Sequence, residues 1–222
     1  KEFSANVSHE LKTPLTSISG YAEIMRDGLV KPADVPKFSE RIYKEAQRML
    51  TLINDIIQLS RLDEGHLEQQ EEAVDLFELS HDIVGRLSSK ADDCGVHMEL
   101  TGEPCIVVGV KRLLDEMIYN ITENAIKYNH AGGRVDLWVG KQMDTPKVIV
   151  TDTGIGIAEE EQERVFERFY RVDKSRSKET GGTGLGLSIV KHGAELSHAK
   201  IKVTSQLGRG TRMELIFEES KN

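Results

Sequence analysis

Two stripes of apolar residues near the N-terminus constrain the fold most strongly. One stripe covers residues 3–25 and the other covers residues 42–62, and in both the apolar side chains recur at steps of three and four. This spacing places them along one narrow side of an α-helix, as in a coiled coil. The intervening residues 27–36 contain Gly28, Pro32 and Pro36 and are typical of a turn. The pattern therefore predicts two helices joined in an αα-hairpin.

A hairpin of this size, covering residues 1–63, buries too little apolar surface to be stable alone. Pairing with a second copy would bury both stripes inside a four-helix bundle. We therefore expect the chain to be a homodimer whose interface is formed by the hairpin.

The sequence changes in character after the hairpin. Residues 64–72 are polar, contain Gly65 and lack periodicity, which indicates a linker. In residues 73–222 helical and strand patterns are mixed, which predicts a layered α/β sandwich as a second domain. The predicted helices cover residues 76–89, 111–128 and 185–196, and the predicted strands cover residues 96–100, 105–108, 135–139, 147–151, 201–205 and 213–217.

The composition narrows the class of partner. The chain is 38% hydrophobic and 30% charged, as in soluble globular proteins, and its net charge of -8 disfavours binding to nucleic acid or anionic membranes. Cys94 and Cys105 lack companion ligands at zinc-like spacing, so we expect reduced thiols in a reducing compartment. There is no signal peptide and no apolar run approaching about 18 residues. Because the chain begins inside a helical pattern, we expect a cytoplasmic fragment of a longer protein.

His9 is the candidate nucleophile of the first helix. It lies off the apolar stripe, two positions after Val7 and two before Leu11, so we expect its ring to face solvent. Imidazole titrates near neutral pH, so the neutral ring that can attack phosphorus is well populated. Glu10 can accept a hydrogen bond from one ring nitrogen, while Pro14 removes a backbone donor and loosens or bends the helix nearby. Alone, the pattern is more typical of an ordinary exposed histidine before a proline kink.

Asn120 and Asn124 lie one turn apart on one face of the predicted helix 111–128. Their amide oxygens suit a hydrated magnesium ion, which prefers oxygen ligands and retains waters. The same spacing also suits a polar pair inside the core. The helix by itself favours neither interpretation.

Asp152 closes a strand pattern and leads into Gly154 and Gly156. A carboxylate in this position can accept an exocyclic amine of a base, and glycines allow the backbone to approach the base closely. As an isolated pattern this is a weak signal for nucleotide binding.

A second group of glycines, Gly182, Gly184 and Gly186, precedes the predicted helix 185–196. Glycine amides and a helix N-terminus together form an anion site. The spacing differs from those of the P-loop and of the dinucleotide fingerprint. Before it, residues 159–169 are expected to form one or two helical turns, and residues 173–183 are polar with no apolar anchor. Because glycines bracket this polar segment, a functional lid is favoured over a disordered loop.

These segments together resemble the two-component sensor histidine kinase family over nearly the whole chain. Residues 3–15 (FSANVSHELKTPL) resemble its H-box, residues 120–128 (NITENAIKY) its N-box, and Phe166 and Phe169 its F-box; the two glycine motifs resemble its remaining boxes. The resemblance implies a dimeric HisKA hairpin followed by an ATP-binding sandwich of the gyrase, MutL and kinase (GHKL, or Bergerat) type. One departure is that residues 196–200 (LSHAK) replace the usual His-Gly-Gly turn, which lies far from the ATP motifs.

By this resemblance His9 is the phosphoacceptor and Glu10 the base that assists it. Thr13 matches the polar residue that orients water when these kinases dephosphorylate their partner. The other interpretation of Thr13 is a hydroxyl that only satisfies the backbone before Pro14.

The resemblance also implies a nucleotide site. Asn124 would ligate magnesium with help from Asn120, Lys127 would meet phosphate, Tyr128 would lie against adenine, and Asp152 would bind the adenine amine. Residues expected to contact phosphate or base from the remaining motifs are Gly154, Gly156, Gly182, Thr183, Gly184, Leu185, Gly186 and Arg171, with Lys174 and Arg176 as weaker candidates.

The implied reaction transfers the γ-phosphoryl group of Mg-ATP to His9 and then to an aspartate on a separate response-regulator receiver, with phosphatase activity toward that regulator. The parent protein is expected to be anchored in the bacterial cell membrane. An ATP hydrolase of the gyrase and MutL type is the main alternative, but those enzymes place a glutamate where Asn120 stands, and an asparagine cannot act as a base. A non-catalytic dimeric scaffold is the other alternative, although none of the expected motif residues is missing.

Overall fold

The computed structural model describes residues 2–63, 70–172 and 182–218. Most of the predicted linker and most of the predicted lid, including Lys174 and Arg176, lie outside the described residues. No helix in the described ranges is both long and apolar enough to cross a membrane.

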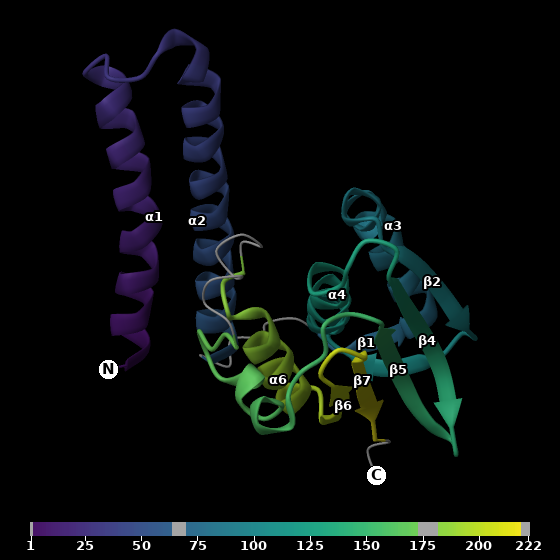
Figure 1. Ribbon diagram of the computed structural model, residues 1–222. Coiled ribbons are helices and arrows are strands. Elements are labelled where there is room, and N and C mark those ends of the chain that lie inside the picture. Colours follow the sequence, from purple (N-terminus) through teal and green to yellow (C-terminus); the bar gives the residue numbers. More distant parts are fainter. Residues whose placement is uncertain (1, 64–69, 173–181, 219–222) are drawn as a thin grey trace.

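The first part of the chain is the predicted helical hairpin (Figure 1). Helix α1 (Glu2–Arg26) continues through Pro14, and α2 (Val35–Asp63) returns alongside it. The connection contains the 3-10 helix η1 (Pro32–Asp34) and Gly28, whose φ of +69° is a left-handed conformation that glycine adopts without strain. Pro36, predicted to belong to the turn, instead lies in the first turn of α2, where its missing N–H breaks no hydrogen bond.

The second part is the predicted α/β sandwich. Helices α3 (Leu76–Cys94), α4 (Lys111–Lys127) and α6 (Gly186–Leu196) pack against one face of a mixed five-stranded sheet (Figure 1). The strand order is β2-β4-β5-β7-β6, with only the β2–β4 pair parallel among the described strands. The strands are β2 (His97–Gly102), β4 (Arg134–Gln142), β5 (Thr145–Asp152), β6 (Ala199–Gln206) and β7 (Gly210–Phe217).

One face of the sheet is apolar and the other is exposed to solvent. In β4 the side chains of Val135, Leu137 and Val139 are completely buried against the helices, whereas those of Arg134 and Asp136 point to the other, open face. This alternation is expected for strands covered by helices on one side only. The sandwich therefore has its own core, independent of the hairpin.

Two local features differ from the sequence-based expectations, and the helical turns expected over residues 159–169 are confirmed as 3-10 helices. Strand β1 (Glu72–Asp75), which pairs with β3 (Ile106–Gly109), was not predicted, and it begins at the last residue of the predicted linker. Strands β4 and β5 run on to a tight turn at Met143 and Asp144, where both residues have positive φ. The expected helical turns are the short 3-10 helices η2 (Glu159–Glu161) and η3 (Arg164–Phe166).

A second, smaller apolar cluster joins the hairpin to the sandwich. Leu52, Leu59 and Leu62 of α2 are buried there with Leu185 and Ile189, at the N-terminal end of α6. The Arg168 guanidinium adds two hydrogen bonds to the Asp63 carboxylate, at 2.9 and 2.6 Å. The C-terminal half of α2 consequently lies against the segment that contains the second glycine motif.

Candidate functional site

His9 is presented to solvent by α1. Its side chain is 80% exposed, and the Thr13 hydroxyl, one turn later, donates a hydrogen bond to the His9 carbonyl oxygen at 3.2 Å. The Glu10 Oε1 atom lies 4.0 Å from Nδ1 of His9, which is beyond hydrogen-bond range. The ring is therefore free to meet an incoming group.

Glu10 is held by arginines rather than by His9. Its Oε2 atom accepts a hydrogen bond from Arg171 at 2.9 Å and lies 3.8 Å from an Arg48 nitrogen. The Arg171 side chain is only 9% exposed, and its Nε atom is buried without a hydrogen-bond partner in the described part of the chain. A buried unpaired donor is costly, so Nε is a candidate donor to an anionic ligand beside α1.

Asp152 lies at the end of β5, as predicted. Its Oδ1 atom accepts hydrogen bonds from the Gly154 N–H at 2.8 Å and from the Thr211 N–H at 3.2 Å. Burial raises the pKa of this carboxyl, and the two N–H donors oppose the rise. Oδ2 has no hydrogen bond from the described residues, so it can accept one from a base.

Backbone crowding explains the first glycine motif. A Cβ at Gly154 would overlap the Tyr128 carbonyl oxygen, and one at Gly156 would overlap the Gln206 carbonyl oxygen. Gly156 also has a φ of +68°. Only glycine allows this loop to lie between the end of α4 and the turn after β6.

The two asparagines face the start of α6. Asn120 donates its amide to the Glu116 carbonyl at 2.8 Å, which fixes the opposite orientation of its side-chain oxygen. A Cβ at Gly186 would lie 2.8 Å from that oxygen and 3.9 Å from the Asn124 amide nitrogen. The two predicted asparagines and the second glycine motif are thus brought together.

Lys127 and Tyr128 meet the other end of this motif. The Lys127 ammonium lies 5.4 Å from the centre of the Tyr128 ring, and both side chains border Gly182, where a Cβ would crowd the ammonium. Burial lowers the pKa of Lys127 to about 8, while the charge of Glu123 works to raise it. At neutral pH the ammonium is still mostly protonated and is poorly neutralised, which suits a phosphate partner.

Thr183 and Leu185 turn toward the hairpin. The Thr183 hydroxyl donates to Asp55 Oδ2 of α2 at 2.6 Å and accepts a hydrogen bond from the Leu185 N–H at 3.3 Å. The Leu185 side chain is completely buried in the cluster with α2. Only the backbone of Leu185 can therefore approach a phosphate. Gly184, with a φ of +74°, passes close to the backbone of Phe169.

Three residues near the site were not predicted from the sequence: Asp55, Ser205 and Thr211. Ser205 accepts a hydrogen bond from the Ile157 N–H at 2.7 Å, and Thr211 supports Asp152 as described above. Asp55 did carry a signal, because it stands three residues after Leu52 and four before Leu59, inside the apolar stripe of α2. Burial raises the pKa of its carboxyl to about 6.

Asp55→Asn is expected to remove a pH dependence of the contact between α2 and the glycine motif. The docked carboxyl has the higher pKa, so this contribution to docking is greatest when Asp55 is protonated and is lost as the pH rises through about 6. Thr183 and the charge of Lys127 oppose the raised pKa, whereas the charge of Glu123 adds to it. Docking should weaken on the order of tenfold between about pH 5 and pH 7, but stay constant with asparagine.

If Thr183 contacts phosphate as the sequence predicts, α2 competes with phosphate for its hydroxyl, and ATP affinity measured by calorimetry over this range reports the docking. Affinity should rise with pH more steeply in the unaltered chain than in Asp55→Asn, since the titration of ATP itself is common to both. Asp34→Asn, in the exposed turn of the hairpin, is the matched control. Identical profiles in all three proteins would contradict the prediction.

Family models and known proteins identify the family of this chain. Residues 109–221 match the model for histidine kinase-, DNA gyrase B- and HSP90-like ATPases, and residues 1–65 match the His kinase A phospho-acceptor domain. The sensor-like histidine kinase SenX3 of Mycolicibacterium smegmatis is 41% identical over 221 residues, which cover 99% of this chain and 57% of SenX3. The chain thus spans little more than half the length of that relative.

Solved structures show the same fold. The histidine kinase AdeS of Acinetobacter baumannii has a TM-score of 0.78 at 22% identity, over 96% of this chain and 98% of AdeS. The histidine kinase ThkA, solved in complex with the response regulator protein TrrA, has the same TM-score and identity over 100% of this chain and 63% of that one. With both parts of the sequence matched by family models, the chain belongs to the sensor histidine kinase family.

Proposed function

We propose that this chain is a histidine kinase core that transfers the γ-phosphoryl group of ATP to His9 and from there to an aspartate of a response-regulator receiver. The observation that carries the proposal is the convergence of the N-box, both glycine motifs and Arg171 at the end of the sandwich that faces the hairpin. Arg171 connects the two parts, because it contacts the residue next to His9.

Some residues of the site would bind the nucleotide, and others would take part in phosphoryl transfer. Asp152 would accept the adenine amine, and the backbone of residues 182–186 with Lys127 would hold the phosphates. The His9 Nε2 atom, on the ring edge away from Glu10, would attack the γ-phosphorus while the bond to the bridging β–γ oxygen breaks and ADP leaves. The Nδ1 proton would pass to Glu10. For this step Arg171 would exchange Glu10 for the transferring phosphoryl group, whose charge it can neutralise.

Magnesium fits the donors in this site. Asn124 and Asn120 are neutral oxygen donors, and no cluster of three or more acidic, histidine or cysteine side chains suited to a metal occurs among the described residues. Such a sparse site suits magnesium, which retains waters and takes its remaining ligands from phosphates. When bound, the ion would neutralise phosphate charge.

The experiment that tests the proposal is incubation of the chain with γ-labelled ATP and magnesium. Label should appear on the protein, be lost in acid and survive alkali, as expected for phosphorus bound to nitrogen. It should then move to a receiver domain. No incorporation into a folded, ATP-binding chain would overturn the proposal.

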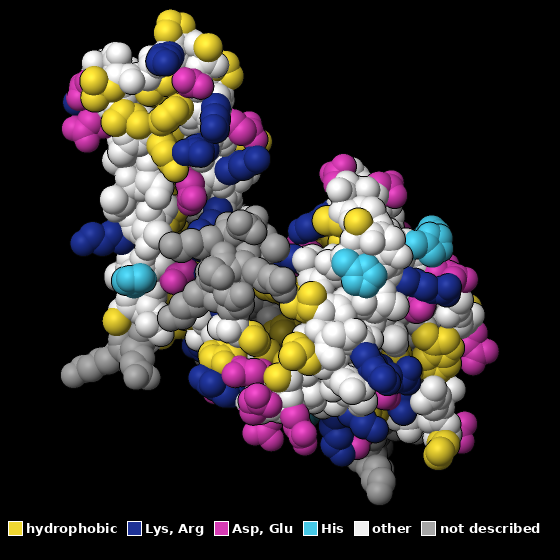
Figure 2. Space-filling model, in the orientation of Figure 1, with side chains coloured by type: hydrophobic (Ala, Val, Ile, Leu, Met, Phe, Trp, Pro, Cys, Tyr) yellow, Lys and Arg dark blue, Asp and Glu magenta, His cyan; other side chains and the backbone are white. Residues whose placement is uncertain are grey.

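The hairpin is also proposed to make the chain a homodimer. Figure 2 shows hydrophobic side chains gathered on the surface at the turn end of the hairpin. Large hydrophobic side chains of the hairpin that are more than a third exposed are Leu15, Leu29, Val35, Tyr43, Leu50 and Ile57. A second hairpin would cover such a surface in a four-helix bundle.

Residues 1–63 alone are expected to dimerise, and residues 70–222 alone are expected to be monomeric and to bind ATP. The reason is that the sandwich buries its own core whereas the hairpin leaves apolar residues exposed. Sedimentation of both fragments at micromolar concentration checks this. Leu50→Glu should dissociate the full chain, while Leu207→Glu, in the exposed turn after β6, should not. A monomeric hairpin would contradict the prediction.

Further features of the parent protein are proposed on the same basis. Within this chain we propose a division into the hairpin (1–63), a linker (64–72) and the catalytic sandwich (73–222). Because ATP is supplied in the cytoplasm, we place this core there, attached to a sensor anchored in the membrane. Thr13, whose hydroxyl lies one turn from His9, is proposed to orient water for dephosphorylation of the regulator.

A further inference from the structure

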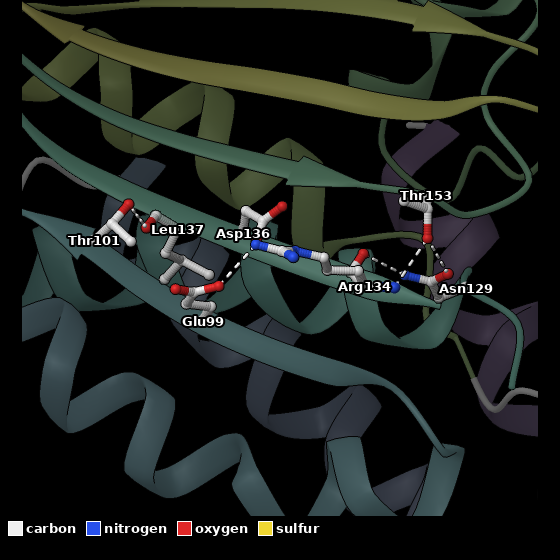
Figure 3. Close-up of polar contacts among 7 residues, drawn as sticks. All are labelled: Glu99, Thr101, Asn129, Arg134, Asp136, Leu137 and Thr153. Atoms are coloured by element: carbon white, nitrogen blue, oxygen red, sulfur yellow. Dashed lines mark hydrogen bonds and ion pairs between the residues drawn. The ribbon is translucent and has the colours of Figure 1, made fainter. Parts of the chain in front are cut away.

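The end of α4 is tied to the loop after β5 by a small set of side-chain hydrogen bonds (Figure 3). The Asn129 Oδ1 atom accepts from the Thr153 hydroxyl at 3.4 Å, and its Nδ2 donates to the Arg134 carbonyl at 3.0 Å. The Arg134 N–H donates a hydrogen bond to the Thr153 hydroxyl at 2.9 Å, and the Thr153 N–H donates one to the Arg134 carbonyl at 3.1 Å. These three residues form a closed ring of contacts, which we call the α4–β5 clamp.

Three backbone features reinforce the clamp. The Ile155 N–H donates to the Tyr128 carbonyl at 3.0 Å, and the loop carries glycine at 154 where a Cβ would strike the same carbonyl. A Cβ at Gly133 would overlap the Asn129 side-chain oxygen, so the clamp requires glycine at that position as well. The connection between α4 and β4 therefore fits around the Asn129 side chain, and the loop after β5 lies against the Tyr128 carbonyl.

The clamp joins the two ends of the nucleotide site. Thr153 follows Asp152 directly in the chain, and Asn129 comes directly after Lys127 and Tyr128 at the end of α4. The base-binding carboxylate is on the sheet and the phosphate-binding groups are on the helix, so a nucleotide must span a separation that the protein sets. Small errors in such a separation weaken binding strongly, because the groups must be held in position before the ligand arrives.

We propose that Asn129 and Thr153 are positioning residues that set the adenine-binding carboxylate of Asp152 at the correct distance and angle from the phosphate-binding end of α4. The proposal rests on the proposed nucleotide-binding roles of Asp152 and Asn124. Neither clamp side chain needs to touch the nucleotide. They act through Asp152, by fixing the start of the loop that follows it.

The Arg134 side chain provides a matched control. Its guanidinium extends along the open face of the sheet, where it pairs with Glu99 at 2.7 Å and Asp136 at 2.6 Å (Figure 3). Its contacts within the clamp use only backbone atoms. Arg134→Ala therefore removes side-chain ion pairs from the same strand and leaves the clamp intact, and exposed pairs of this kind contribute little to stability.

The experiment compares Asn129→Ala, Thr153→Val, Thr153→Ser and Arg134→Ala in the full chain. ATP and GTP dissociation constants are measured by calorimetry, and the rate of autophosphorylation is measured at saturating ATP. Asn129→Ala and Thr153→Val should weaken ATP about tenfold, reduce the preference for ATP over GTP, and leave the saturated rate within about threefold, since the clamp acts on positioning of the base. Thr153→Ser, which keeps the hydroxyl, and Arg134→Ala should behave as the unaltered chain.

Asp152→Asn, measured in parallel, distinguishes the positioning role of the clamp from the base-binding role of Asp152. If Asp152→Asn reduces the preference for ATP but Asn129→Ala and Thr153→Val do not, the positioning role is overturned while the proposed role of Asp152 stands. If Asp152→Asn has no effect, both fall. Equal losses for ATP and GTP, with a lowered melting temperature, would reduce the clamp to a stabilising contact and would also overturn the proposal. If Asn129→Ala folds poorly, the pair Thr153→Val and Thr153→Ser decides the question.

Discussion

Replacing His9 with glutamine is expected to abolish autophosphorylation completely while leaving ATP affinity unchanged. Glutamine has similar reach, but its amide nitrogen is not a nucleophile, so no phosphorus–nitrogen bond can form at this position. The His9 side chain is 80% exposed, so the substitution should alter the free energy of unfolding by no more than about 0.5 kcal/mol. Labelling with γ-labelled ATP and calorimetry on the same preparation measure both effects.

His97→Gln is the matched control, because this histidine is also exposed but lies on β2 at the far edge of the sheet. It should incorporate label at the normal rate. Acid-labile label that persists in His9→Gln would place the phosphoacceptor elsewhere. Loss of ATP binding together with labelling would mean that His9 acts through the structure and not as the acceptor.

Short-range patterns predicted most of this fold. The stripe over residues 3–25 corresponds to α1 at Glu2–Arg26, because the spacing of apolar residues along a helix is a local property. Strand β1 was missed because Val74 is its only buried residue and its partner β3 lies some thirty residues further on; residue 75 pairs with residue 106. Pairing over such a separation leaves little trace in the local pattern.

The site residues were predicted by type and motif, whereas their contacts with the hairpin were not. Nothing in the sequence around Thr183 indicates that its hydroxyl meets Asp55, because that contact depends on how α2 packs against α6. The same holds for Arg171 and Glu10, which are far apart in the chain. The sequence did give one indication of such a contact, which is the charged Asp55 within the apolar stripe of α2. A buried carboxylate is retained only where it has a partner.

The contacts between the hairpin and the sandwich involve groups that are also proposed to bind the nucleotide. Two groups proposed to bind phosphate, the Thr183 hydroxyl and the Arg171 guanidinium, are here occupied by carboxylates of the hairpin. A nucleotide phosphate offers the same kind of acceptor oxygen as a carboxylate, so it competes for the same donors. If both groups bind phosphate as proposed, nucleotide binding and the position of the hairpin are linked, and each alters the free energy of the other.

Substitutions at the two ends of the nucleotide site are expected to impair different parts of nucleotide binding, namely the magnesium dependence at one end and the affinity for adenine at the other. Asn124→Ala removes a side-chain oxygen proposed to hold magnesium, so it should abolish the enhancement of ATP binding by magnesium. Asp152→Asn keeps the size of the side chain, but its amide group donates where Oδ2 would accept the adenine amine. It should therefore weaken ATP and ADP at least about tenfold while changing GTP affinity little, because an unmade hydrogen bond in a buried site costs about 1–3 kcal/mol. Calorimetry with each nucleotide, with and without magnesium, separates the two effects.

Asp144→Asn, in the exposed turn between β4 and β5, is the control and should bind nucleotides as the unaltered chain does. If Asn124→Ala and Asp152→Asn both bind ATP with unchanged affinity and magnesium dependence, the nucleotide does not occupy the space between α4 and the end of β5.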